Sequence, residues 1–111
     1  MKRIYLDHTA TTPLDPRVLE AMMPFFSEKF GNASSVHWYG QQAKIALEKA
    51  RETIARAIGA QAGEVFFTSG GTESDNFAIK GIAYAAGRNG KNHIITSKAE
   101  HHAVIEPCEH L

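Results

Sequence analysis

Two short segments of this sequence hold the residue types best suited to chemistry. The first is Ser69-Gly70-Gly71-Thr72 and the second is Lys98-Ala99-Glu100-His101-His102. In the first segment, two adjacent glycines let a ligand approach the backbone without a Cβ in the way. Thr72 adds a hydroxyl and an amide where we expect a helix to start. The free N–H groups and the dipole of such a first turn favour an anion by about 0.3–1 kcal/mol, so the segment suggests a phosphate site.

The glycine pair has a second explanation that needs no ligand. Gly70-Gly71 also suits a tight strand-to-helix turn, with Thr72 or Ser74 as the helix cap. The segment is not a Walker A motif, because no Gly-Lys-Ser/Thr follows, and it is not Gly-x-Gly-x-x-Gly. Residue types alone leave both interpretations open.

The second segment offers an imidazole. Adjacent residues point in different directions, so at most one of His101 and His102 is expected to face a ligand. A neutral imidazole there can stack on a flat ring and exchange protons near neutral pH. The alternative is a pair of surface histidines without a function. These histidines, with Glu100, Asp7 and His8, include metal-ligand types, but no His-x-x-x-His or His-Glu-x-x-His spacing occurs, and we predict no metal site.

The elements around these two segments explain why they should meet. The sequence predicts a strand over 64–69, a helix from about Thr72 to Arg88 and a strand over 93–97. A helix of this length between two strands favours a parallel pair joined by a right-handed crossover. Ligands of open α/β sheets bind outside the carboxyl ends of the strands. Both segments are therefore expected to face one crevice.

The remaining elements are mainly helical. We expect a short strand over 4–6 and a helix over 16–26, with Asp15 as N-cap and a doubtful last turn at Pro24. A loop over 30–40 and a helix over 41–58 that ends at Gly59 should follow. The last element is a helix from Ala103 to the end, interrupted by Pro107. The fold class is α/β. The chain divides into a mainly helical segment, 1–60, and a βαβ segment, 61–111, within a single partial domain.

Composition excludes several function classes. Twelve basic and twelve acidic residues cancel, and no basic run is interleaved with aromatic residues, so we predict no nucleic-acid partner. No apolar stretch approaches the ~18 residues of a membrane helix. The apolar run after Met1-Lys2-Arg3 is too short for a signal peptide, which favours the cytoplasm. The single cysteine, Cys108, cannot form an internal disulfide and has no basic neighbour in sequence to activate it.

At the two segments the sequence resembles a known family. The run 68–76, Thr-Ser-Gly-Gly-Thr-Glu-Ser-Asp-Asn, resembles the phosphate-cup motif of cysteine desulfurases of the bacterial iron–sulfur-assembly type. Three further stretches are similar to that family in the same order, namely 5–13, 30–37 and 94–101. Together the four matches cover essentially the whole chain, and the nine-residue run is the most specific.

The resemblance implies a fold-type I pyridoxal-phosphate enzyme of the class V aminotransferase group. It implies that the chain holds the amino-terminal part of the large domain, that the full enzyme is a homodimer, and that it converts L-cysteine to L-alanine while passing sulfur to an enzyme cysteine. An iron–sulfur scaffold protein is a possible acceptor. By position, Gly71 and Thr72 are expected to bind the phosphate of pyridoxal 5′-phosphate, and His101 to stack on its ring and serve in proton transfer.

The chain departs from the family in length. The Schiff-base lysine of the family sits in a Ser-x-His-Lys context, and that motif does not occur here. Neither Lys98 nor Cys108 stands at the position of the family's lysine or nucleophilic cysteine. We therefore interpret the chain as an amino-terminal fragment that is inactive and only marginally stable alone. The alternatives are a selenocysteine lyase or aminotransferase of the same group, a non-catalytic α/β module that binds a phosphate-bearing ligand, and a fragment used only for assembly.

Overall fold

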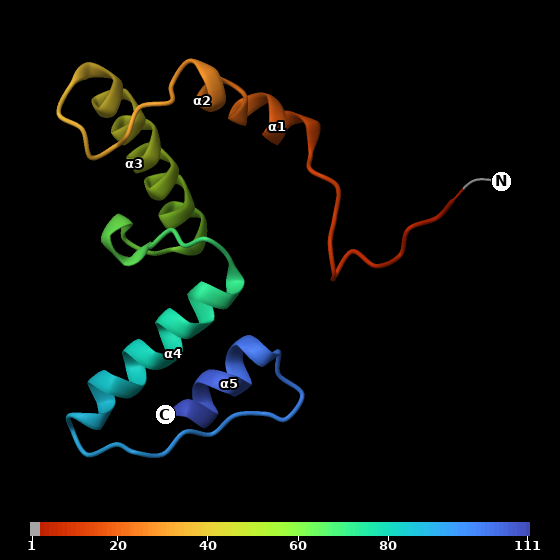
Figure 1. Cartoon of the computed structure of the whole chain (residues 1–111), viewed down its shortest axis with the longest axis vertical. Coiled ribbons are helices and arrows are strands. Elements are labelled where there is room, and N and C mark those ends of the chain that lie inside the picture. Colours follow the sequence, from red (N-terminus) through yellow and green to blue (C-terminus); the bar gives the residue numbers. More distant parts are fainter. Residues whose placement is uncertain (1–2) are drawn as a thin grey trace. The chain divides into compact units, whose positions relative to one another are not determined.

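The computed structural model describes residues 3–111, which form two compact units, one up to Val65 and one from Phe66 to Leu111 (Figure 1). The first unit contains α1 (Pro16–Met22), α2 (Pro24–Ser27), α3 (Trp38–Ile58) and the 3-10 helix η1 (Ala62–Glu64). The second contains α4 (Gly71–Gly87) and α5 (His102–His110). The division of the chain into a mainly helical segment, 1–60, and a βαβ cofactor-binding segment, 61–111, stays a prediction.

The expected helix over 16–26 is broken near its end, as Pro24 suggested. The Asp15 carboxylate caps α1 by accepting a hydrogen bond from the Arg17 N–H at 2.8 Å, and Pro16 occupies the first helical position. The Arg17 guanidinium, which donates to the same carboxylate, lowers the pKa of Asp15. The helix ends at Met22, and Pro24 begins the separate short helix α2. The run 4–6, expected as a strand, lies outside regular structure.

The long helix α3 begins three residues before its expected start at Gln41. His37 is its N-cap, and the His37 Nδ1 accepts a hydrogen bond from the Gly40 N–H at 3.4 Å. The Gly-, Asn- and Ser-rich composition of 30–40 predicts a loop over the whole run, and residues 38–40 are instead helical. The expected end is confirmed, because Gly59 adopts the left-handed conformation (φ 71°) just after Ile58.

A close backbone approach explains one glycine of α3. A Cβ at Gly40 would lie 2.6 Å from the Asn32 carbonyl oxygen and 2.7 Å from the Ser35 Cβ. The loop before α3 therefore folds back on the first turn of the helix, and Gly40 is buried there.

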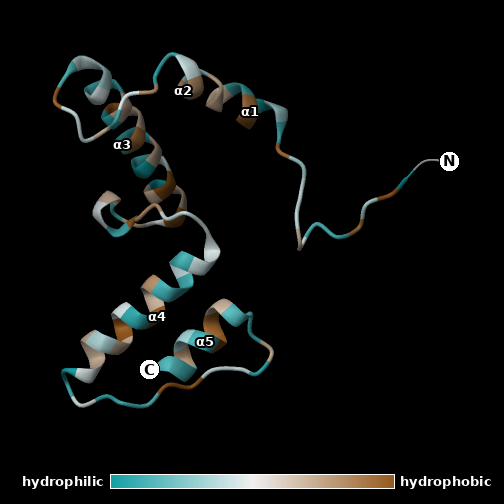
Figure 2. Cartoon of the chain, in the orientation of Figure 1, coloured by the Kyte–Doolittle hydropathy of each residue, from teal (hydrophilic) through white to brown (hydrophobic). Residues whose placement is uncertain are grey.

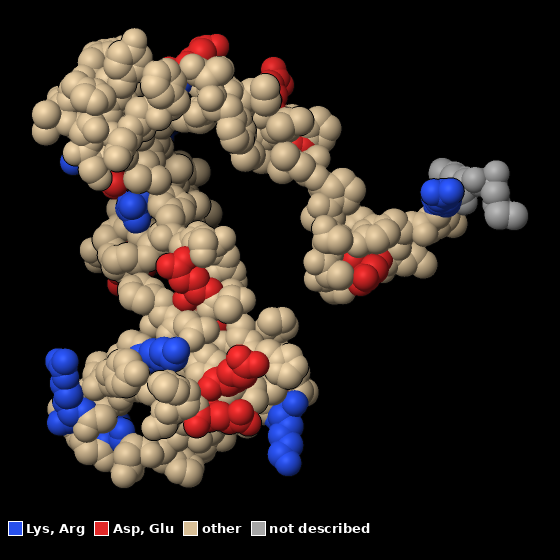
Figure 3. Space-filling model, viewed as in Figure 1, with Lys and Arg blue, Asp and Glu red and all other residues tan. Residues whose placement is uncertain are grey.

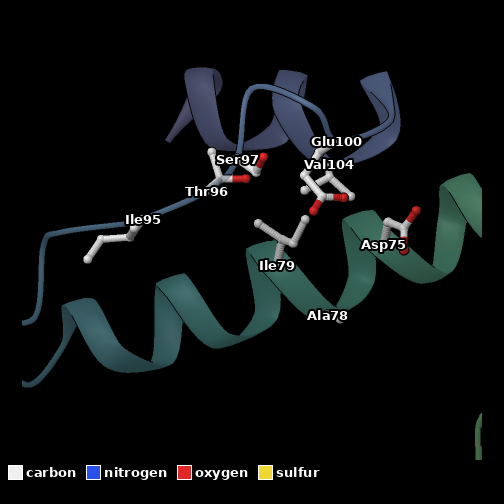
Figure 4. Close-up of a pocket in the computed structure, with 8 residues that line it drawn as sticks. All are labelled: Asp75, Ala78, Ile79, Ile95, Thr96, Ser97, Glu100 and Val104. Carbon is white, nitrogen blue, oxygen red and sulfur yellow. The ribbon is translucent and has the colours of Figure 1, made fainter.

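In the second unit, α4 and α5 pack against each other and run in the same direction (Figure 1). Ile79 of α4 points toward Val104 of α5 (Figure 4). The contact buries Ala103 and Pro107. Because the helices are parallel, both N-termini lie at the same end of the pair.

The expected interruption at Pro107 is wrong. Helix α5 continues through Pro107 to His110. A proline at this position removes the hydrogen bond to the carbonyl of Ala103, four residues earlier. Both Ala103 and Pro107 are buried residues of α5.

The two predicted strands are not formed in the described part of the chain. Within residues 3–111 the only regular structure is helical, and residues 65–68 and 91–97, which flank α4, have none. A strand requires a hydrogen-bonded neighbour. Phe66 is 65% exposed and Ile95 is 88% exposed, so neither side chain is covered as it would be in a sheet. The Phe66 ring does meet the Phe77 ring of α4 edge-on at 5.8 Å, and Ile95 lines a cavity with Ile79. The helix and its flanking extended segments match the expected order, whereas the βαβ pairing does not appear.

Very little of the apolar surface is covered. Among residues 3–111 only Gly40, Ala55, Ala103 and Pro107 are buried. Hydrophobic positions of α3, α4 and the segment before α5 remain on the surface (Figure 2). A burial this small agrees with the expectation that the 111-residue chain is marginally stable alone.

Charges on the face drawn in Figure 3 are interspersed, with acidic groups between the cationic ones. The balance of twelve basic and twelve acidic residues is consistent with this pattern. Across residues 3–111, every helix is too short or too polar to span a bilayer.

Candidate functional site

The glycine turn leads directly into α4. Gly70 is the N-cap residue, and the Ser74 N–H donates to its carbonyl oxygen at 3.1 Å. Since glycine has no side chain, no side-chain hydrogen bond caps the helix. Neither Thr72 nor Ser74 is the N-cap, so the expectation that one of them caps the helix is wrong. The amides of the first three helical residues precede the first intrahelical bond and are available to a ligand.

Neither conformation nor crowding within the chain explains the two glycines. Gly70 has an extended backbone (φ 166°) that any residue can adopt. A Cβ built on Gly70 or Gly71 meets no atom within 4 Å. The open space beside both glycines leaves room for close approach of a group from outside these residues.

Polar side chains flank the turn on both sides. The Glu73 Oε2 accepts hydrogen bonds from the Ser69 N–H and the Ser69 hydroxyl, both at 2.6 Å. Both donors lower the pKa of the Glu73 carboxyl, and the Ser69 hydroxyl has the larger effect. The Thr68 and Ser74 hydroxyls lie 2.6 Å apart. Residues before the turn are thus bonded to the first turn of α4.

His101 is held at the start of α5. It is the N-cap of this helix, and its Nδ1 accepts a hydrogen bond from the Ala103 N–H at 3.1 Å. Because a backbone N–H can only donate, this bond selects the tautomer in which Nδ1 is unprotonated and Nε2 carries the proton. The ring orientation is therefore fixed through one nitrogen, and Nε2 is left to meet a ligand.

His102 lines one cavity together with His101, so the expectation that at most one of the two faces a ligand site is wrong. Its Nδ1 lies 3.8 Å from the Glu106 Oε1, one turn along α5, and the two histidine rings are inclined at 73°. Of the pair, His101 is the one fixed at the helix start.

One cavity of about 440 Å³ brings Thr72 and His101 together. Its other lining residues are Asn76 and Lys80 on α4 and His102, Ala103, Glu106, Pro107 and His110 on α5. Thr72 and His101 lie at the N-terminal ends of two parallel helices, so both helix dipoles favour negative charge at that end of the cavity. Gly71 precedes Thr72 in the chain and is not among the lining residues.

Sequence reasoning missed the other polar residues of this cavity. Thr72, Asn76 and Lys80 recur at every fourth position of α4, and His102, Glu106 and His110 do so on α5. Residues spaced by four share one helix face. Polar residues at this spacing on two consecutive helices are the signal that was overlooked.

Cys108 belongs to a different part of the second unit. It lines a larger cavity of about 850 Å³ with mainly apolar residues of α4 and of the segment before α5. Neither Thr72 nor His101 lines that cavity.

Comparisons with known proteins are consistent across the chain. Residues 4–111 match the family model described as aminotransferase class-V. The chain is 62% identical over its whole length to cysteine desulfurase IscS of Dictyoglomus turgidum, covering 28% of that protein. It is 56% identical to putative cysteine desulfurase IscS 1 of Bacillus subtilis, again over its whole length and covering 29% of that protein.

A solved structure supports the same assignment. A NifS-like protein matches with a TM-score of 0.88 at 43% identity, over 98% of this chain and 30% of that one. The chain thus has the fold of the corresponding part of a NifS-like protein, and it spans less than a third of the length of these relatives. The family match over 4–111, together with these relatives, shows that the chain belongs to the aminotransferase class-V family.

Proposed function

We propose that these residues form the phosphate-binding part of a pyridoxal-phosphate-dependent cysteine desulfurase. The observation that carries the proposal is the shared cavity of Thr72 and His101 at the N-terminal ends of two parallel helices. The relatives that bear the name cysteine desulfurase support the choice of reaction. The reaction converts L-cysteine to L-alanine and transfers the sulfur to an enzyme cysteine.

The residues present fit the phosphate of the cofactor. The open space beside Gly70 and Gly71 admits an oxygen to the backbone, and the first amides of α4 point outward. Thr72, which carries a hydroxyl, lines the cavity next to them. Each hydrogen bond to a charged oxygen contributes roughly 1.5–3 kcal/mol. In this proposal, Gly71 supplies its amide and Thr72 its amide and hydroxyl.

His101 faces the flat part of the cofactor in this proposal. The Ala103 N–H holds Nδ1, so the imidazole has one orientation in which its face stacks on a ring and its Nε2 is free to hold or pass a proton. When bound, pyridoxal phosphate supplies an electron sink that stabilises negative charge on the substrate carbon. His101 is thus the catalytic residue we assign within this chain.

Several finer points belong to the same proposal. They include the parallel pairing of segments 64–69 and 93–97 in the complete fold, a homodimer, an iron–sulfur scaffold protein as sulfur acceptor, and a cytoplasmic location. The flanking segments of α4 expose apolar residues such as Phe66 and Ile95, which neighbouring strands would cover. A second, narrower candidate is a selenocysteine lyase or aminotransferase of the same family.

Two measurements test the proposal. The reading frame that contains these residues is expected to encode a Ser-x-His-Lys motif downstream, and its purified product to release alanine and transferable sulfur from L-cysteine with pyridoxal phosphate. Transamination without sulfur release would favour an aminotransferase. A strong preference for L-selenocysteine over L-cysteine would favour a selenocysteine lyase. The 111-residue chain alone is expected to release no sulfide, and sulfide release by this chain would contradict our assignment of the missing groups. A phosphate-bound product without any amino-acid turnover would favour a non-catalytic module.

A further inference from the structure

The glycine turn is held by a carboxylate that does not face the cavity of Thr72 and His101. The Glu73 Oε2 accepts from both donors of Ser69, the residue before the glycine pair. Glu73 is not among the residues that line that cavity. We infer that Glu73 is a positioning residue, which sets the conformation of the Ser69–Thr72 turn before phosphate binds. This inference rests on the proposed phosphate-binding function of the turn.

The geometry of the two bonds supports this role. Both donors lie 2.6 Å from the same carboxylate oxygen, short distances typical of charge-assisted hydrogen bonds. Both donors favour the charged form of the carboxyl and so lower the pKa of Glu73. The bonds join residues 69 and 73 across the glycine pair, so they close the turn into a ring.

A second pair of contacts reinforces the ring. The Thr68 hydroxyl donates to the Gly70 carbonyl oxygen at 3.2 Å and lies 2.6 Å from the Ser74 hydroxyl, which can donate to it in turn. The Gly70 carbonyl is thereby turned away from the ligand side, since it also accepts from the Ser74 N–H. The amides of the turn remain for the phosphate.

The need for such a device follows from the glycines. Adjacent glycines have more backbone freedom to lose on ordering than any other pair. A binding turn built from them is weak unless its flanks are fixed beforehand, because pre-organisation reduces the entropy lost on binding. Glu73 and Ser69 provide this constraint from outside the binding surface.

The experiment compares Glu73→Ala with Glu73→Gln and Ser69→Ala in the full chain. Glutamine keeps an oxygen that can accept from Ser69, whereas alanine removes it, and Ser69→Ala removes one donor without altering α4. Asp75→Ala is the matched control, because it removes one acidic group from the same region of α4 without touching Ser69. The probes are inorganic phosphate and pyridoxal phosphate, followed through the amide shifts of Gly70–Thr72. Hydrogen exchange at the Ser69 amide, measured without ligand, reports the turn itself.

We expect Glu73→Ala to weaken phosphate binding about tenfold and to remove the protection of the Ser69 amide. The phosphate affinity of Glu73→Gln is expected to stay within about threefold of that of the parent. The affinity of Ser69→Ala should lie between those of Glu73→Ala and Glu73→Gln, and Asp75→Ala should bind phosphate as tightly as the parent. Parent-like phosphate binding by both Glu73→Ala and Ser69→Ala would overturn the role of Glu73 and leave the phosphate site intact. Absence of any shift at Gly70–Thr72 in the parent chain would overturn the proposed function and this inference with it.

Discussion

Thr72, the second residue of α4, and His101, the N-cap of α5, line the same cavity. They are brought together because the two helices pack in parallel, with the segment 88–101 returning along the pair (Figure 1). Parallel packing places two helix N-termini side by side, and each favours an anion. The arrangement gives one end of the cavity the electrostatic character that a phosphate requires and sets an imidazole beside it.

The Thr72 hydroxyl should account for part of the affinity for phosphate. We expect Thr72→Val, which keeps the shape and removes the hydroxyl, to weaken phosphate binding about tenfold, as one charge-assisted hydrogen bond is lost. Thr72→Ser should stay close to the parent. Isothermal calorimetry or amide shift titration of the full chain measures both, and equal affinities for the valine and serine variants would show that the hydroxyl makes no such bond.

Two variants separate the roles of His101. His101→Phe keeps a flat ring and removes the capping nitrogen, whereas His101→Asn keeps a capping side chain and removes the ring. We expect His101→Asn to weaken pyridoxal phosphate binding by about two- to tenfold, the value of an aromatic contact, and His101→Phe to change it less.

The capping role has its own measurement. Faster hydrogen exchange at the Ala103 amide is expected in His101→Phe and not in His101→Asn, because Nδ1 accepts from this N–H. Faster exchange in His101→Asn and not in His101→Phe would mean that the hydrogen bond from the Ala103 N–H does not hold the His101 ring.

The contacts of Glu73 should be lost in acid. Its pKa is lowered in the folded chain by the Ser69 hydroxyl and N–H. A group with a lowered folded pKa stabilises the fold above its unfolded pKa, and this contribution disappears as pH falls through the lowered value. The Ser69 amide shift should therefore titrate below the pKa of a free glutamate and should not titrate in Glu73→Gln. A Ser69 shift that is constant through this acid range in the parent would contradict the assignment.

Gly40 should tolerate no side chain. Gly40→Ala places a Cβ against the Asn32 carbonyl oxygen and the Ser35 Cβ, and overpacking of this kind costs typically about 1–3 kcal/mol. Loss of hydrogen-exchange protection at the start of α3 is the expected result. Gly63→Ala is the control, because a Cβ there meets no atom within 4 Å. Equal protection in the two variants would show that the loop before α3 does not pack on the helix.

Local signals in the sequence predicted the helices well and the sheet poorly. Asp15-Pro16 and Gly59 marked helix ends correctly, because capping is decided by neighbouring residues. The Gly-, Asn- and Ser-rich run 30–40 predicted a loop that is too long, because α3 already begins after His37. Pro107 predicted an interruption that α5 does not have. The strands depend on hydrogen-bonded partners far along the chain, and within residues 3–111 no strand pairs with the segments of Phe66 and Ile95.

The sequence predicted that Thr72 and His101 lie close together, but it did not predict the other polar residues that line their cavity. Thr72 and His101 could be paired from the order of elements, because both follow extended segments that flank one helix. Lys80 and His110 could not, since their meeting depends on how α4 and α5 pack rather than on any motif.

The most direct test is the position of bound pyridoxal phosphate in the full chain, determined by crystallography or by contacts from the cofactor to assigned protons. We predict that the phosphate lies against the amides of Gly71 and Thr72 while the pyridine ring lies against the imidazole of His101. A cofactor whose phosphate is bound elsewhere, or whose ring does not contact His101, would contradict the assignment of this cavity.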